Sequence, residues 1–128
     1  MEKSKNYIQD IHKDNQNWLK DLQFYADELL VFDKELVDVS SKNTSKDVKQ
    51  KVEKFQNQFV IQRNEIDYLR HLATLQEDHL VAEVKENPVA VDHRKMTENQ
   101  TLKNRMAIFV PIYTVMKEDF RDFLSKHL

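Results

Sequence analysis

Histidine and carboxylate side chains are the first candidates for chemistry in this chain, because helical bundles can hold metal ions between them. A carboxylate-rich metal site of that kind needs inward-facing Glu residues and a Glu-x-x-His pair three residues apart. The chain has five histidines, and none of them completes such a pair. The nearest approximations are Asp67 with His71 and Gln76 with His79. The sequence therefore does not predict a di-iron type of site.

A weaker metal hypothesis stays open at one end of the molecule. If the helices are antiparallel, His12, His79 and His93 lie towards the same end, and three imidazoles could hold a transition metal. The alternative interpretation is solvated histidines at the end of a bundle. We predict no metal site and no cofactor, and we keep a metal- or small-ligand-binding bundle as the alternative function.

Nucleophilic and phosphate chemistry lack the residues that they need. The chain has no cysteine and no glycine, and its serines gather at Ser40, Ser41 and Ser45 without a nearby histidine and carboxylate. Phosphate-binding loops use glycine so that the backbone can approach the ligand closely. We predict no catalytic residues and a protein that is not an enzyme.

Charge and hydropathy exclude further classes of partner. The net charge is only -2 although 33% of the residues are charged, so bulk electrostatics do not indicate a nucleic-acid binder. A basic run of Lys42, Lys46, Lys49, Lys51 and Lys54 is explained by acidic residues of the preceding helix, which are Glu28, Asp33, Glu35 and Asp38. The longest apolar stretch, 106–116, is too short to span a bilayer. With no cysteine and no apolar signal segment at the start, we expect a cytoplasmic protein that binds neither nucleic acid nor membrane.

The absence of glycine also predicts a chain that is nearly all helix, broken in two places. The first break is 40–44, where Asn43 could take the left-handed conformation that usually requires glycine, and Thr44 with Asp47 resembles a capping box. The second break is 87–92, where Asn87 could play the same part before Pro88. The third helix starts either at Asp92 or at Thr97.

Between these breaks the apolar residues follow alternating steps of three and four, which places them on one stripe of each helix. The stripes predict helices over roughly 6–40, 45–86 and 93–126 in one domain, 1–128, folded as an elongated antiparallel up-down-up three-helix bundle. The first stripe is Ile8, Ile11, Asn15, Trp18, Leu22, Tyr25, Leu29, Phe32, Leu36 and Val39. The second is Val48, Val52, Phe55, Phe59, Gln62, Ile66, Leu69, Ala73, Gln76 and Leu80. The third is Asn99, Leu102, Met106, Phe109, Tyr113, Met116, Phe120 and Phe123.

Four polar residues interrupt these stripes, and we interpret them as determinants of helix register. Asn15, Gln76 and Asn99 are expected to meet in a polar layer near the second break, and Gln62 lies deeper. Pro111 falls opposite the third stripe, which predicts a kink in a continuous helix.

The clearest functional indication is apolar surface outside the stripes. The second helix carries a further stripe of Ile61, Tyr68, Leu72, Leu75 and Ala82. Apolar patches of this kind usually mark interfaces, and we predict an interface at Phe24, Val31, Ile108, Ile112 and Val115. The expected function is association with proteins, as a homo-oligomer, most simply a homodimer, or with a partner helix in a groove.

The layout of three long antiparallel helices, with a tryptophan on the first stripe in Asn17-Trp18-Leu19, resembles a spectrin-type repeat. Such repeats carry a second tryptophan in the third helix, where this chain has Phe109, Tyr113 and Phe120. The resemblance implies the bundle architecture alone, since a shared layout warrants no function.

Overall fold

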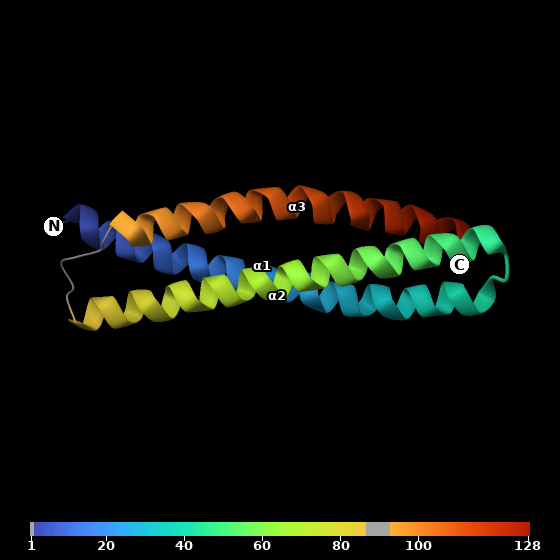
Figure 1. Ribbon diagram of the computed structural model, residues 1–128, viewed down its shortest axis with the longest axis horizontal. Coiled ribbons are helices and arrows are strands. Elements are labelled where there is room, and N and C mark those ends of the chain that lie inside the picture. Colours follow the sequence, from blue (N-terminus) through green and yellow to red (C-terminus); the bar gives the residue numbers. More distant parts are fainter. Residues whose placement is uncertain (1, 87–92) are drawn as a thin grey trace.

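The computed structural model describes the backbone of residues 2–86 and 93–128 and the side chains of residues 8–82 and 98–128. Its three helices are α1 (Glu2–Lys42), α2 (Lys46–Glu86) and α3 (His93–His127). α1 and α3 run in one direction and α2 in the other, along a rod-shaped molecule (Figure 1). The prediction of an all-α, up-down-up three-helix bundle is confirmed.

The helix ends differ slightly from the predicted ones. α1 extends through Ser40 and Ser41, which we had placed in the turn, and ends at Lys42. α3 begins at His93, directly after Asp92, so Thr97 lies inside the helix and not at its start. The 41 residues of α1 correspond to roughly 60 Å at 1.5 Å per residue.

The core consists of the three predicted stripes. Their apolar members are buried on all three helices, apart from Ile8, Trp18 and Tyr25, which are half-buried. The centre is dense in aromatic rings: the Phe120 ring lies 5.0 Å from Phe59 and 5.1 Å from Phe32, measured between centroids. Edge-on and tilted contacts of this kind stabilise beyond the apolar area that they bury. Leu124, which flanks the third stripe, is buried as well.

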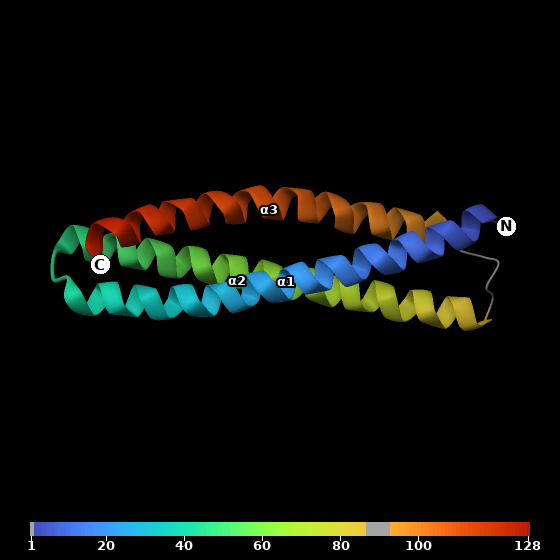
Figure 2. The same cartoon turned by 180° about the vertical axis from the view of Figure 1, so that it is seen from behind.

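The three helices do not pack equally. α1 and α2 make the closest contact, and α3 lies over both of them. In Figures 1 and 2, α3 arches away from the other two helices along its middle. Pro111 lies in this part of α3, is exposed, and does not interrupt the helix. Because proline has no N–H, the Ala107 carbonyl receives no helical hydrogen bond from it, and a helix bends around its core at such a point.

The connection between α1 and α2 corrects two predictions. No described residue has a positive φ, so Asn43 does not act as a left-handed cap. The Asn43 side chain caps the helix ends: its Nδ2 donates hydrogen bonds to the Val39 carbonyl at 2.9 Å and to the His127 carbonyl at 3.1 Å. The residue that caps α2 is Ser45, whose Oγ accepts a hydrogen bond from the Val48 N–H at 3.2 Å. The predicted capping box of Thr44 and Asp47 is therefore wrong. Asn87 lies outside the described residues.

Across the described parts of the chain, no helix combines the length and the apolar character that a membrane span needs.

Candidate functional site

An apolar groove runs along the outer face between α2 and α3. The position of one cation fixes how the two helices face each other: the guanidinium carbon of Arg105 lies 4.9 Å from the centroid of the Tyr68 ring. Side chains three or four residues apart share a helix flank, so the flank of Tyr68 on α2 and the flank of Arg105 on α3 form the two walls. We name this surface the α2–α3 groove, and its apolar members are Ile61, Tyr68, Leu72, Leu75, Ile108, Ile112 and Val115.

The members of the α2–α3 groove on α3 are unusually exposed for branched aliphatic side chains. The exposed fraction is 64% for Ile108, 53% for Ile112 and 57% for Val115. On α2, Ile61 is 61% exposed. The groove is therefore an apolar surface in contact with water and not a widened core.

Two hollows shape the groove on either side of the Tyr68–Arg105 contact. One has a volume of about 370 Å³ and is lined by Gln58, Gln62, Pro111, Ile112, Val115 and Met116. The other has a volume of about 310 Å³ and is lined by Leu72, Leu75, Gln76, His79, Glu98, Thr101 and Leu102. Both are lined by α2 and α3, and both can receive protruding apolar side chains.

Charged side chains are few on both walls at the middle of the groove, where Glu65 lies between Ile61 and Tyr68 on the flank of α2. Residues 106–116 of α3 and residues 55–62 of α2 contain no Asp, Glu, Lys or Arg. The Tyr68–Arg105 contact and the antiparallel direction of the helices place residues 55–62 beside the second half of the α3 stretch, whereas Glu65 of α2 lies beside Ile108. Depletion of charged residues distinguishes the core of a protein interface from ordinary surface.

A second groove, between α1 and α3, is of a different kind. Phe24 and Val31 line a hollow of about 490 Å³ there, together with Glu28, Glu35 and Arg121 among other residues. Its remaining lining residues are Asp27, Phe32 and Leu124. Lys117 lines an adjoining hollow. We name this surface the α1–α3 groove, and both of its walls carry charged groups.

The five residues predicted as an interface are therefore divided between two faces. Ile108, Ile112 and Val115 lie in the α2–α3 groove, whereas Phe24 and Val31 lie in the α1–α3 groove. The further stripe noted on α2 turns out to be the opposite wall of the first of these grooves. Which flank of a helix faces which neighbour depends on the handedness of the bundle. The spacing of the apolar residues does not determine that handedness.

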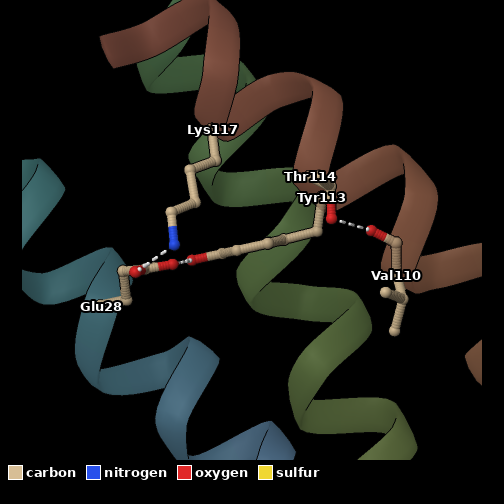
Figure 3. A network of polar contacts seen from close by, with 5 residues as sticks. All are labelled: Glu28, Val110, Tyr113, Thr114 and Lys117. Atoms are coloured by element: carbon tan, nitrogen blue, oxygen red, sulfur yellow. Dashed lines mark hydrogen bonds and ion pairs between the residues drawn. The ribbon is translucent and has the colours of Figure 1, made fainter.

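A polar network closes the floor of the α1–α3 groove (Figure 3). The Tyr113 hydroxyl donates a hydrogen bond to Glu28 Oε1 at 2.7 Å, and Lys117 Nζ lies 2.7 Å from Glu28 Oε2. Burial raises the pKa of Tyr113 far above its usual value, and the hydrogen bond to Glu28 raises it further. Tyr113 therefore stays a neutral donor at physiological pH, which suits a structural link between helices and not proton transfer.

This network was missed in the sequence because Glu28 and Lys117 each flank a stripe without belonging to it. A signal was present: the two residues have opposite charges and each lies next to a stripe position, on helices that run in the same direction. Such flanking pairs commonly bridge neighbouring helices of a bundle.

The residues of the predicted polar layer are buried or half-buried towards one end of the bundle, and one of them contacts an acidic residue that the sequence did not predict. Asn15 is fully buried, and its Nδ2 donates to Glu77 Oε2 at 3.0 Å. Glu77 Oε1 contacts His12 Nδ1. Gln76 is buried, and Asn99 is half-buried on α3. Glu77 serves here as the acceptor that holds α1 to α2.

The histidine hypothesis finds no assembled ligand set in the described side chains, which contain no group of three His, Asp or Glu residues able to hold a metal ion. His12 is engaged with Glu77, and His79 lines the smaller hollow of the α2–α3 groove. The side chain of His93 lies outside the described residues.

Two of the acidic residues that the sequence paired with the lysine run have other partners. Asp33 pairs with Arg63 of α2, and Glu28 pairs with Lys117 of α3. The predicted explanation of the basic run is therefore wrong for these two acids. The short connection places the lysine run beside the very end of α1. Asp33 lies further back along α1, so it faces Arg63, about two turns after the last lysine of the run.

In comparisons with protein-family models, with curated proteins and with solved structures, no match to this chain was found.

Proposed function

We propose that this protein is a non-enzymatic helical bundle that acts by associating with another protein through the α2–α3 groove. The observation that carries this proposal is the coincidence of exposed aliphatic side chains with the uncharged stretches of both walls. Ile61, Ile108, Ile112 and Val115 are each more than half exposed. Fully burying a side chain of this type stabilises by roughly 1.5–3 kcal/mol, so covering all four yields several kcal/mol before the cost of association.

The α1–α3 groove is a secondary candidate within the same proposal. Phe24 and Val31 are 58% and 54% exposed, but charged side chains surround them. Such a rim suits a polar, weaker contact, because exposed charge pairs contribute little affinity. We therefore assign Ile108, Ile112 and Val115 to the main interface, and Phe24 and Val31 to a separate, weaker contact.

We place this association in the cytoplasm, on the sequence argument from the absence of cysteine. The partner is a protein and not a nucleic acid, since the uncharged stretches 55–62 and 106–116 offer no basic side chain and phosphate binding needs basic side chains.

Site-specific photo-crosslinking in the cells that produce the protein tests this proposal. A photoreactive phenylalanine analogue at position 108 or 112 is expected to give covalent protein adducts on irradiation. The same analogue at position 37 is the control, because Val37 is 65% exposed and shares its flank of α1 with Asp33, which faces α2. Absence of adducts at positions 24, 31, 108 and 112 would overturn the proposal.

A small apolar ligand is the alternative function, and the smaller hollow of the α2–α3 groove favours it. Three leucines line this hollow beside His79 and Thr101, and pockets that are mostly apolar with a few polar groups are typical ligand sites. Native mass spectrometry of the protein purified from its source is expected to show an added mass if this alternative holds. Replacing Leu75 by Glu should then remove that mass without changing the photo-crosslinks at position 112.

A further inference from the structure

We propose that the partner in the α2–α3 groove is a second copy of this chain, with the two α3 helices antiparallel about a two-fold axis near Ile112. This inference rests on the proposed function, because it names the occupant of the same groove. The order of charges along α3 supports it.

The exposed flank of α3 is a second heptad stripe. Its members follow steps of four and three, so they remain on one flank along nearly six turns. They are Thr101, Arg105, Ile108, Ile112, Val115, Asp119 and Asp122. The stripe is apolar in the middle, basic on one side of the middle and acidic on the other.

This order is complementary to itself only when it is reversed. In an antiparallel pair centred near Ile112, Arg105 of one copy lies beside Asp119 of the other, and Ile108 lies beside Val115. The two-fold axis repeats each contact, as an isologous interface requires. A parallel pair would instead place Arg105 beside Arg105 and Asp119 beside Asp119, and like charges in contact oppose association by several kcal/mol.

The wall formed by α2 supports the same arrangement. The Tyr68 ring holds the guanidinium of Arg105 at 4.9 Å, which restricts the long side chain before any partner arrives. Ile61 adds apolar surface beside Ile112, since both belong to the uncharged middle of the groove. The middle of α3 also arches away from α1 and α2 (Figure 2), so it is the part of this helix that a second copy reaches first.

A charge-reversal cycle read by sedimentation equilibrium tests the pairing. The purified protein is expected to be a dimer at micromolar concentration. The single variants Arg105→Asp and Asp119→Arg should each weaken the dimer about tenfold or more, equivalent to ~1.4 kcal/mol, and the double variant should recover most of that loss. Lys34→Asp, an exposed reversal on α1, is the matched control and should leave the dimer unchanged. Failure of the double variant to recover the loss would overturn the pairing.

Cysteine crosslinking tests the orientation, because the chain has no cysteine of its own. Ile112→Cys should form a disulfide-linked dimer on mild oxidation. Arg105→Cys alone should not, whereas a mixture of Arg105→Cys and Asp119→Cys should give a mixed dimer. Efficient linkage of Arg105→Cys to itself would show a parallel pair and overturn the inference. Circular dichroism of each variant confirms that it is folded.

The two proposals can fail separately. If the protein sediments as a monomer at all concentrations while position 112 still captures a different protein in cells, the inference of a second copy is wrong and the proposed function stands. If the protein is monomeric and position 112 captures nothing, both are wrong.

Discussion

The hydroxyl of Tyr113 donates a 2.7 Å hydrogen bond to Glu28, and this contact fastens α3 to α1. These two helices pack less closely against each other than either does against α2. Tyr113 is 1% exposed, so the bond is shielded from water where it meets the carboxylate. A hydrogen bond to a charged group contributes about 1.5–3 kcal/mol.

Tyr113→Phe is therefore expected to lower the free energy of unfolding by about 1–3 kcal/mol, since it removes the donor and keeps the ring. Urea denaturation followed by circular dichroism measures the change. Tyr68→Phe, on the exposed wall of the α2–α3 groove, is the control and should change stability by less than about 0.5 kcal/mol. Equal effects of the two substitutions would contradict this account of the network.

The stability of the fold should also decline in alkali because of Tyr113. Burial and the Glu28 hydrogen bond raise its pKa in the folded state, whereas the unfolded chain has the usual value of about 10. The folded state thus binds the proton more tightly, so this contribution is complete below about pH 10 and is lost as the pH rises above it. Burial, followed by Asp21 and Glu28, raises the pKa of Tyr25 in the same direction. Urea midpoints measured from pH 8 to pH 11 should fall more steeply for the natural protein than for Tyr113→Phe, and parallel curves would refute the prediction.

Asn43 distinguishes two ways of ending a helix. Its side chain donates to the carbonyls of Val39 and His127, and its backbone is not left-handed. Both Asn43→Ala and Asn43→Gly should therefore destabilise the protein, by about 1 kcal/mol or more. A left-handed residue would instead be improved by glycine. Thermal unfolding of the two variants separates these cases. A higher melting temperature for Asn43→Gly would show that the backbone of residue 43 is left-handed.

The start of α2 allows a matched pair of adjacent substitutions. Ser45→Ala removes the acceptor of the Val48 N–H and should cost about 1 kcal/mol, the usual loss for a helix N-cap. Thr44→Ala, one residue earlier and exposed, should have little effect. The reverse order of effects, measured by chemical denaturation, would restore the capping box that the sequence had suggested.

Gln62 lies at a stripe position and is 8% exposed, next to apolar residues that include Met116. Gln62→Leu should raise the melting temperature by a few degrees, because a polar residue at a core position costs stability. Asn15→Leu is the comparison and should lower it, since Asn15 donates to Glu77. A large loss of stability in Gln62→Leu would show that its amide has a structural role.

Much of the fold was predictable because apolar residues that recur every three or four positions lie on the same face of a helix. Leu22, Phe59 and Phe120 are all fully buried, as their spacing predicts. The helix ends were less predictable. At the end of α1, a helix can be capped either by a side-chain hydrogen bond or by a left-handed backbone. The sequence does not decide between the two, so the roles of Asn43 and Ser45 are seen only in the structure.

The candidate site was predictable in its residues and not in its geometry. Exposed Ile108 and Ile112 follow from their position outside the stripe, but their pairing with Ile61 depends on the register between α2 and α3. That register is set by packing in three dimensions, and the Tyr68–Arg105 contact reveals it. Glu77 was missed because it neighbours a stripe, where burial depends on the helix opposite.

The backbone of the described residues tolerates sequence variation. The chain has no glycine, and no described residue adopts a positive φ, so at these positions the path of the chain does not depend on the conformational freedom of glycine. An alanine scan of the described residues other than Pro111 should therefore report side-chain interactions and helix propensity, without a contribution from left-handed backbone. For the same reason, substitutions can accumulate on the exposed faces of the rod while its shape persists.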